Sequence, residues 1–370
     1  MHYYGLKKLN QNNYRNSTDI KICYWPGRES NYSRNRVLLK AMYATSLNVL
    51  DCSAAPKDLF RYFKSFLKFL RSYQKCDIVL IGFLGHFLVP IARIFTRKPI
   101  IFDSFVSIYM TMCLDRKKFN PNGILAVLAK WIDKKSCQLA DIIICDTNEH
   151  IKYFTENYNI DPKKFIRLWV GSDESIMHPQ SHILEKPNLI HFHGEFQSLH
   201  GIETIIAAAS LIPEAHFRLI GKGETRKQCE EIVFSLKLYN VEFMDPVPYE
   251  QLPRLMSEAK ICLGIFGESI KTQSVIPHKI FEALAVGRPL ITADTPASRE
   301  LLTHKENAYL CNTANAESLA AAIRELQSNE ELRQSIAEKG HKTFQEKCSF
   351  NVLGNEIQSI IEEFMNKKPI

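Results

Sequence analysis

The chain has 370 residues, of which 45% are hydrophobic and 24% are charged. These fractions are typical of soluble globular proteins and argue against a collagen-like, a disordered or an integral membrane protein, while the length favours two domains. The formal net charge of +7 indicates attraction to anions in general, without choosing among phosphate esters, acidic lipids and nucleic acid.

The ten cysteines are scattered, with no CxxC pair and no His/Cys cluster at zinc-ligand spacing. Neither a disulfide framework nor a metal site is therefore predicted, and a reducing cytoplasm is the expected compartment. Residues 1–18 form a polar extension without the apolar run of a signal peptide, so export is not expected. The most apolar stretch, 78–95, contains Gly, His, Pro and Arg, which favours a buried strand, a turn and a helix over a membrane span.

Short apolar runs rich in β-branched residues alternate with longer helical patterns along the chain, which is typical of βαβ units on parallel sheets. The predicted strands of the first half are 20–25, 46–51, 78–83, 99–103, 142–146 and 165–170. Those of the second half are 189–193, 216–220, 241–244, 261–266, 289–293 and 308–311. Helical patterns fill most gaps of the second half, at 202–212, 225–238, 249–259, 277–286 and 316–327. The prediction is an α/β fold of two Rossmann-like, doubly wound parallel-sheet domains that face a cleft.

The expected domain boundaries follow the same alternation. An acceptor-side domain spans 19–174, a polar linker without periodicity spans 175–186, and a donor-nucleotide domain spans 187–349. A C-terminal helical segment, 350–370, is expected to pack back on the first domain. Parallel sheets of this kind bind ligands at the carboxyl ends of their strands, where helix N-termini face a crevice. Functional residues are therefore expected just after strands.

The segment 274–292 is the most informative of these. Pro277 suits the first turn of a helix, and Gly287 suits the C-terminal cap before the next strand. Lys279 and Glu282 are three residues apart, so they share one face near the helix start, where a polar pair can meet the phosphate and ribose of a nucleotide. An ordinary surface ion pair is the alternative interpretation.

Two glycine-bounded loops follow other strands of the second half. The loop at 193–201 leads into a helix and offers backbone N–H groups and a helix dipole to an anion such as a diphosphate. The turn at 219–224 is weaker evidence, and any βα loop could have either pattern. The segment 264–273 also ends a strand, and both a binding loop and a plain surface turn remain open.

In their order and approximate spacing these segments resemble the retaining GT-B glycosyltransferases of family four, which include many bacterial polysaccharide transferases. ADIIICDTN at 140–148 and KFIRLWVGSD at 164–173 add to the resemblance, which covers nearly the whole chain. It implies a GT-B fold and transfer of a sugar, with retention, from a nucleotide sugar to a saccharide or lipid-linked acceptor in cell-surface polysaccharide biosynthesis. It also implies that no metal or other cofactor takes part.

The resemblance further implies a set of donor contacts. Glu282 would accept hydrogen bonds from the donor ribose, since an ionised carboxylate can accept from both hydroxyls of a diol. The chain departs from the family's pattern at Glu195 and His200, where many relatives carry Arg and Lys, and at Ser274, where many carry a first glutamate. The candidate donor-binding residues are Gly194, Glu195, His200, Gly201, Gly221, Lys222, Ser274, Lys279 and Glu282.

Two features of the first half are expected to lie on the acceptor side. Gly27 and Arg28 follow the first strand and form the candidate acceptor-side loop. Asp103 ends the fourth strand and is the candidate catalytic group beside the reaction centre, with a capping or turn residue as the alternative.

A basic amphipathic helix is predicted at 59–75. Its apolar residues, which recur at helical spacing, are Leu59, Phe63, Phe66, Leu67 and Leu70, and its basic stripe includes Arg61, Lys64, Lys68 and Arg71. The basic stripe either faces water or contacts an anionic membrane, where a lipid-linked acceptor would be found. A cytoplasmic protein that binds the inner face of the cell membrane is the expectation.

Two other functions remain open at this point. The missing Arg, Lys and first Glu favour a GT-B-like subunit that binds a sugar nucleotide without transferring it. A GT-B epimerase that acts on the nucleotide sugar itself is the second alternative. No nucleic-acid partner is expected, because no recognition motif accompanies the basic charge.

Overall fold

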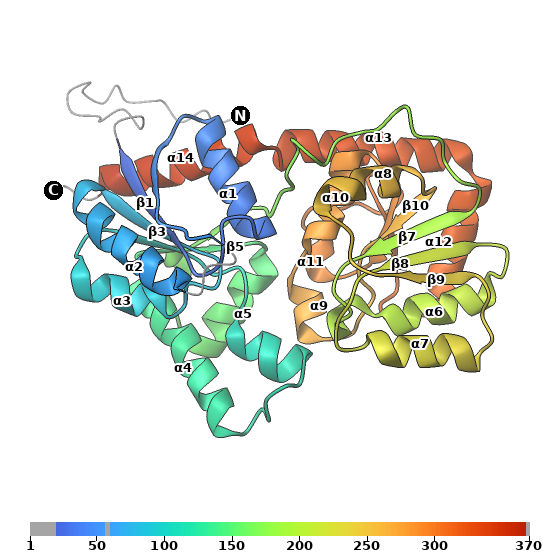
Figure 1. Cartoon of the computed structure of the whole chain (residues 1–370), viewed down its shortest axis with the longest axis horizontal. Helices are drawn as coiled ribbons and strands as arrows, with labels where there is room; N and C mark the ends of the chain where they lie inside the picture. The colour runs from blue at the N-terminus through green and yellow to red at the C-terminus, as the bar shows by residue number, and fades with distance from the viewer. Residues whose placement is uncertain (1–19, 56–59, 368–370) are drawn as a thin grey trace, which may run out of the picture.

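A computed structural model describes residues 20–55 and 60–367. The polar extension expected at 1–18, Leu59, and the last three residues of the expected C-terminal segment lie outside the described residues. The chain forms two α/β domains, and Figure 1 shows them side by side with the C-terminal helices running along the top of both.

The N-terminal domain contains a six-stranded parallel sheet in the order β2-β1-β3-β4-β5-β6. Its strands are β1 (Lys21–Pro26), β2 (Asn48–Asp51), β3 (Ile78–Gly82), β4 (Ile100–Asp103), β5 (Ile142–Cys145) and β6 (Phe165–Arg167). In register, Ile22 of β1 lies between Val49 of β2 and Ile78 of β3. Both faces of β3 are buried, as expected for a parallel sheet covered by helices.

Helices cover both faces of this sheet. They are α1 (Ser33–Ala44), α2 (Arg61–Ser72), α3 (Leu88–Phe95), α4 (Ile124–Leu139) and α5 (Asn148–Tyr158), with a π-helical turn at Met110–Asp115 before α4. Helix α1 packs in the apolar cluster on one face, whereas α2, α3, α4 and α5 contribute to the cluster on the other. Alternate side chains of β1 point to opposite faces of the sheet. Ile22 and Tyr24 face α1, while Cys23 and Trp25 face α2.

The C-terminal domain contains a second parallel sheet in the order β12-β11-β10-β7-β8-β9. Its strands are β7 (Leu189–His193), β8 (His216–Ile220), β9 (Val241–Met244), β10 (Ile261–Leu263), β11 (Leu290–Ala293) and β12 (Tyr309–Cys311). Its helices are α6 (Ile202–Leu211), α7 (Arg226–Ser235), α8 (Leu252–Ser257), α9 (Ile270–Ser274), α10 (His278–Val286), α11 (Pro296–Arg299), α12 (Ala316–Ser328) and α13 (Glu330–Lys347). This strand order is that of a Rossmann domain, so the predicted fold of two doubly wound parallel sheets is confirmed.

The last helix, α14 (Phe350–Lys367), returns to the N-terminal domain. Helix α13 packs on α10 of the second domain, whereas α14 packs on α1 of the first. A Cβ atom at Gly354 would lie 2.3 Å from the carbonyl oxygen of Ala41, so the absence of a side chain there allows the close approach of α14 to α1.

Helix α2 differs from the expected orientation. Its buried residues are Ser65 and Phe69, while Phe63 is 60% exposed, so the expectation that Phe63 belongs to the inward stripe is wrong. The indole nitrogen of Trp25 donates a hydrogen bond of 2.8 Å to Ser65 Oγ and thereby fixes the rotation of the helix. A residue two positions from Ser65 lies on the opposite side of an α-helix.

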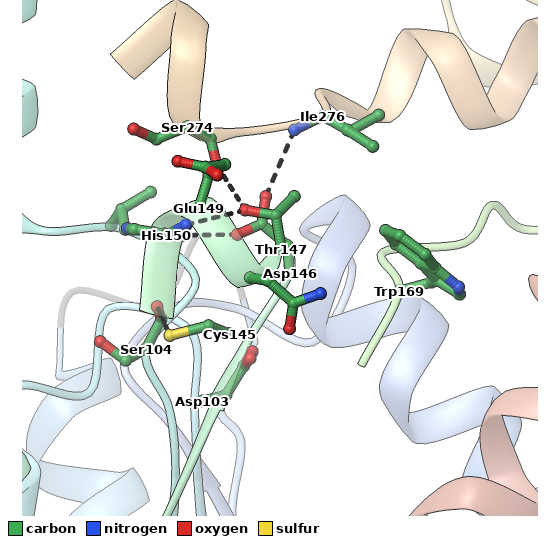
Figure 2. A network of polar contacts seen from close by, with 12 residues as sticks. Asp103, Ser104, Cys145, Asp146, Thr147, Glu149, His150, Trp169, Ser274 and Ile276 are labelled. Carbon is green, nitrogen blue, oxygen red and sulfur yellow. Dashed lines mark hydrogen bonds and ion pairs between the residues drawn. The ribbon is translucent and has the colours of Figure 1, made fainter. Parts of the chain in front are cut away.

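A polar network joins the two domains at the end of β5. Thr147 Oγ1 donates to the carbonyl oxygen of Ser274, and the N–H of Ile276 donates to Asp146 Oδ2 at 3.4 Å. Asp146 Oδ1 also lies 2.7 Å from His150 Nδ1, so one carboxylate links α5 to the second domain. Figure 2 shows Asp146, Thr147 and His150 beneath the segment that connects α9 and α10, which carries Ile276.

Candidate active site

A cavity of about 780 Å³ lies between the two domains. In each sheet the strand order reverses at one point, between β1 and β3 in the first and between β7 and β10 in the second. Ligands of doubly wound sheets bind at such points, beyond the carboxyl ends of the strands. Arg28 and Leu84 follow β1 and β3, Gly194 and Lys271 follow β7 and β10, and all four line the cavity. The two switch points therefore face one shared cavity.

The two walls of the cavity differ in polarity. The second domain contributes mostly polar side chains, among them His193, Glu195, Gln197, His200, Lys271, His278, Lys279 and Glu282. The first domain contributes mostly apolar ones, including Phe83, Leu84, Phe87, Phe105, Ile108, Met112, Phe119, Leu125, Leu128 and Ile132. Such a cavity suits a ligand that is anionic at one end and less polar at the other.

The N-terminus of α10 presents two unsatisfied polar atoms to this cavity. Neither Lys279 Nζ nor His278 Nε2 has a hydrogen-bond partner among the described residues, although both atoms are buried. No side chain caps the helix, whose dipole leaves partial positive charge at this end. Buried polar atoms normally find a partner, so these two indicate a place for a ligand that accepts hydrogen bonds.

Burial shifts the pKa values of both side chains. It holds the pKa of Lys279 well below its usual range, although Glu282 and Glu195 oppose the shift. The amine lies 4.0 Å from the centroid of the Phe192 ring, a contact that compensates only part of its lost hydration. Burial likewise lowers the pKa of His278 to about 4, so its imidazole is neutral at pH 7. An anion bound here would favour the charged form of Lys279.

Additional positive charge comes from residues that the sequence did not single out. Arg116 and Lys271 line the cavity, and Lys271 is only 8% exposed. Burial lowers the pKa of Lys271, although Asp115, whose carboxylate lies 3.9 Å from the amine, opposes this. With Arg28 and Lys279 these residues give the lining four cationic groups, against the carboxylates of Glu195 and Glu282.

Glu195 and His200 stand where the family pattern carries Arg and Lys, and Arg116 and Lys271 are cations elsewhere in the cavity lining. Lys271 belongs to the segment 264–273, where the sequence left open a binding loop, and Ser269 caps the short helix α9 that holds it. No sequence signal pointed to Arg116. His200 adds no charge, because burial holds its pKa well below the usual range.

A chain of buried hydrogen bonds orients Glu282. His193 Nε2 lies 2.8 Å from Glu282 Oε2, and His191 Nε2 lies 3.0 Å from His193 Nδ1. Since an ionised carboxylate only accepts, His193 donates from Nε2 and accepts at Nδ1, which requires His191 to donate in turn. Arg218 closes the chain with its Nε atom 3.4 Å from His191 Nδ1. Each N–H group in the chain therefore donates in the direction that leads from Arg218 to Glu282.

The same contacts keep Glu282 ionised. Burial alone would raise its pKa, but the hydrogen bond from His193, with smaller effects of His278 and Tyr249, brings the pKa below its usual value. Only 4% of the residue is exposed, and it lines the cavity. The site thus holds a fixed carboxylate beside an unsatisfied amine. Neither His191 nor His193 was singled out as a site residue, although His193 begins the predicted loop.

The glycines of the donor loops have distinct structural roles. Gly194 lines the cavity at a φ of 143°, and a Cβ atom there would lie 2.7 Å from Lys279 Nζ. Gly221 lies behind it, where a Cβ atom would lie 1.8 Å from the carbonyl oxygen of Gly194. Gly201 precedes α6 and packs against Phe266. Gly221 and Gly201 do not line the cavity themselves.

The placement of Lys222 and Ser274 does not support the donor contacts expected of them. Lys222 is exposed and lies outside the cavity lining. Ser274 also lies outside it, because its hydroxyl donates to the carbonyl of Ile270 at 2.8 Å and its own carbonyl accepts from Thr147. Predicted donor residues that do line the cavity are Gly194, Glu195, His200, Lys279 and Glu282.

On the acceptor side, Arg28 and Asp103 have different placements. Arg28 lines the cavity and stacks over the ring of Tyr32, while Gly27 packs so closely on Leu84 that a Cβ atom would clash with its carbonyl. Asp103 does not line the cavity. It is fully buried, and both carboxylate oxygens accept from the guanidinium of Arg34, at 2.9 and 3.1 Å. Figure 2 draws it apart from the hydrogen bonds at the domain joint.

The placement of Asp103 therefore favours a structural role, joining β4 to α1, over the catalytic role expected from the sequence. Within 20–55 and 60–367, no group of three or more His, Cys, Asp and Glu side chains could hold a metal ion. In the same residues, no helix is long and apolar enough to cross a bilayer. That catalysis needs no metal stays a prediction.

Residues 173–343 match the family model of glycosyl transferases group 1. The chain is 24% identical over 296 residues to chitobiosyldiphosphodolichol beta-mannosyltransferase of Debaryomyces hansenii, a match that covers 70% of this chain and 61% of the relative. It is 24% identical over 150 residues to the lipopolysaccharide core biosynthesis glycosyltransferase LpsE of Rhizobium meliloti, covering 40% and 42% of the two chains. These matches thus cover less than two thirds of either relative.

The fold resembles solved structures over nearly the whole chain. Sucrose-phosphate synthase of Thermosynechococcus elongatus superposes with a TM-score of 0.74 at 15% identity, covering 94% of this chain and all of that one. HepE of Anabaena in complex with UDP-glucose gives 0.71 at 13% identity, covering 93% and 100%. Residues 173–343 thus resemble a glycosyl transferases group 1 domain, and the chain as a whole has a two-domain GT-B fold.

Proposed function

We propose that this chain is a glycosyltransferase that moves a sugar from a nucleotide sugar to a saccharide or lipid-linked acceptor, with retention of configuration and without a metal. The observation that carries the proposal is the pair of Lys279 and Glu282 on one turn of α10. Lys279 presents an unsatisfied buried amine and Glu282 a fixed carboxylate to the same cavity.

The two groups match the two polar parts of a nucleotide sugar. The diphosphate binds at the N-terminus of α10, where Lys279 and the helix dipole favour negative charge. Glu282 accepts hydrogen bonds from the vicinal hydroxyls of the ribose. A molecule held in this way has its sugar in the cavity between the domains, facing the wall of the first domain.

Transfer breaks the bond between the sugar's anomeric carbon and the diphosphate oxygen. The nucleoside diphosphate leaves with the electron pair, and it takes up the proton that the acceptor hydroxyl loses as it bonds to that carbon. Lys279, Lys271 and the α10 N-terminus stabilise the charge that develops on the leaving group, which is the role of preorganised electrostatics. The apolar wall of the first domain limits the access of water and thereby hydrolysis of the donor.

The acceptor is a saccharide, free or carried on a lipid, of cell-surface polysaccharide biosynthesis. This part of the proposal is supported by the names of the two relatives, which refer to chitobiosyldiphosphodolichol and to biosynthesis of the lipopolysaccharide core. The apolar residues of the first-domain wall are compatible with a lipid-linked acceptor. The protein then works in the cytoplasm, at the inner face of the cell membrane.

A panel of nucleotide sugars in a thermal-shift assay tests donor binding, because a ligand that binds only the folded state raises the melting temperature. Glu282→Ala should weaken the affinity of the responding donor about tenfold or more, since hydrogen bonds to a charged group contribute about 1.5 to 3 kcal/mol each. Unchanged affinity in a folded variant would contradict the assignment.

Release of nucleoside diphosphate that depends on an added acceptor, and persists in EDTA, tests transfer and its independence of metal. Binding without such release would instead favour the non-catalytic subunit. Conversion of the nucleotide sugar to its epimer without release would favour the epimerase.

A further inference from the structure

The positive charge of the chain is concentrated on one part of the N-terminal domain. Residues 61–135 contain fourteen Lys or Arg, four Asp and no Glu, whereas the whole chain has a net charge of only +7. Three of the four aspartates, Asp103, Asp115 and Asp133, are fully buried. The surface of this segment, which includes α2, α3 and α4, is therefore strongly basic.

The same three helices expose large apolar side chains. On α4, Ile124, Val127 and Trp131 are 88%, 65% and 54% exposed. Ile94 of α3 and Phe63 of α2 are also more than half exposed. Exposed apolar residues of this size are expected at interaction sites when they cluster. Figure 1 shows α2, α3 and α4 on the side of the N-terminal domain opposite to α14.

This surface is continuous with the mouth of the cavity. Leu84, Phe87, Leu125 and Leu128 line the cavity and are also exposed at the surface. Helix α4 thus forms part of the cavity wall with Leu125 and Leu128, while Ile124, Val127 and Trp131 lie outside the cavity lining. A molecule that covers the outer side of α4 would meet the apolar entrance of the cavity.

We propose that this surface, called here the α2–α4 face and defined by the exposed residues of α2, of α3 and of residues 124–134 of α4, docks on an anionic lipid bilayer. Ile124, Val127 and Trp131 enter the interfacial region, where aromatic and aliphatic side chains are favoured. Lys64, Lys68 and Arg71 of α2 and Lys130 and Lys134 of α4 approach the anionic headgroups.

Charge complementarity indicates which partner binds the α2–α4 face. A second copy of this chain would place the same cationic residues against one another, which like-charge repulsion disfavours. An anionic bilayer offers negative headgroups and an apolar layer at once, which matches the exposed basic and apolar side chains of α2 and α4 and the exposed Ile94 of α3. The proposal goes beyond the proposed transfer reaction and does not depend on it, because docking requires neither donor nor acceptor.

Trp131 provides a direct measurement. The chain has three tryptophans, and Trp25 and Trp169 are buried. When vesicles of phosphatidylglycerol and phosphatidylcholine are added at low ionic strength, the protein should sediment with them. Its tryptophan emission should also shift to shorter wavelength as Trp131 leaves water. Vesicles of phosphatidylcholine alone should bind much less, and added salt should weaken binding, because the Debye length falls to about 8 Å at physiological ionic strength.

Two sets of substitutions separate the apolar and the basic contributions. Ile124→Gln, Val127→Gln and Trp131→Gln together should lower vesicle binding about tenfold or more, while Gln preserves helix propensity. Neutralising Arg61, Lys64, Lys68 and Arg71 together should also weaken binding and reduce its dependence on salt. The matched control is Phe234→Gln with Tyr239→Gln, which removes two exposed aromatic residues of the second domain and should leave binding unchanged.

The proposal is overturned if the wild type does not bind anionic vesicles at low salt, or if the α4 variant binds as well as the wild type. It is also overturned if the lipid-free protein is a dimer that the α4 variant converts to a monomer, because the face would then bind a second copy. Donor binding by thermal shift, measured on the same variants, should stay unchanged. Failure of docking and failure of the proposed transfer function are therefore distinguishable.

Discussion

His193 Nε2 lies 2.8 Å from Glu282 Oε2, and the two side chains are only 10% and 6% exposed. The contact joins the end of β7 to α10, so the strand that begins the donor loop also orients the carboxylate of the donor site. A second histidine and a buried arginine continue the hydrogen bonds behind it. This arrangement fixes one oxygen of Glu282, whose carboxylate lines the cavity and can accept hydrogen bonds from a ligand.

Replacing His193 should change the pH dependence of donor binding. In His193→Leu the carboxylate of Glu282 stays buried but loses the contact that lowers its pKa, so it becomes protonated at a higher pH than in the wild type. The ionised form accepts the hydroxyl hydrogen bonds. As the pH is lowered, donor affinity should therefore begin to decrease at a higher pH in the variant than in the wild type. The pH profile of the donor dissociation constant measures this shift.

The matched control is His216→Leu, which removes an exposed His–Glu pair with Glu242 in the same domain. Its pH profile should equal that of the wild type, because an exposed pair is screened by water. An unshifted profile in His193→Leu would show that His193 does not set the protonation of Glu282.

Lys279→Met should have opposite effects on stability and on binding. The wild-type protein buries an amine without a hydrogen-bond partner, so an apolar side chain of similar length should raise the melting temperature of the ligand-free protein. The same change should weaken nucleotide-sugar binding by about tenfold or more, since it removes a charge-assisted contact to the diphosphate. Thermal unfolding with and without the donor measures both effects.

Lys222→Met provides the comparison, because Lys222 is exposed outside the cavity. It should change neither the melting temperature nor the affinity by a measurable amount. Equal behaviour of the two lysine variants would argue against an anion site at α10.

Asp103→Asn should reduce stability and leave donor binding intact. Loss of the carboxylate leaves the guanidinium of Arg34 buried without its counter-charge, and breaking a buried ion pair costs about 3 to 5 kcal/mol. Urea denaturation measures this loss. Exchanging both partners, with Arg34→Met and Asp103→Leu, should recover part of it.

If Asp103→Asn instead keeps its stability and abolishes transfer, Asp103 acts in catalysis as the sequence first suggested. Donor affinity of the folded variant, measured below the onset of urea unfolding, serves as the control for an intact second domain.

Mild acid should destabilise the protein, partly through His278. Burial lowers the pKa of this residue from 6.5 to about 4, so between these values the unfolded chain binds a proton that the folded chain does not. Stability therefore falls as the pH decreases from about 6.5 toward 4, with His278 contributing up to about 3 kcal/mol. Burial lowers the pKa values of His86, His191 and His200 as well, which adds to the same trend.

His278→Gln should flatten this dependence without abolishing it, as measured by urea denaturation at several pH values. His182→Gln is a suitable control because it replaces an exposed histidine of the interdomain segment. A slope that is unchanged in His278→Gln would mean that this imidazole is protonated in the folded protein.

The sequence by itself determined the order and type of the elements. All twelve predicted strands form, because runs such as 78–83 are apolar over a strand's length and are separated from the next run by helical patterns or turn residues. The placement of Lys279 and Glu282 at the start of α10 also followed from local chemistry, since Pro277 and Gly287 bound that helix on either side. These are short-range preferences, which a single sequence records.

Only the tertiary structure decided which side chains share a cavity. Arg116 and Lys271 come from different domains, and their convergence depends on how the two sheets face each other. Asp103 ends a strand as expected, but its carboxylate is paired with the guanidinium of Arg34, which lies 69 residues earlier in the chain. In the His191–His193–Glu282 chain, the directly bonded residues His193 and Glu282 are likewise 89 positions apart. Local patterns carry no information on such pairings, because long-range packing selects the partner of a buried polar group.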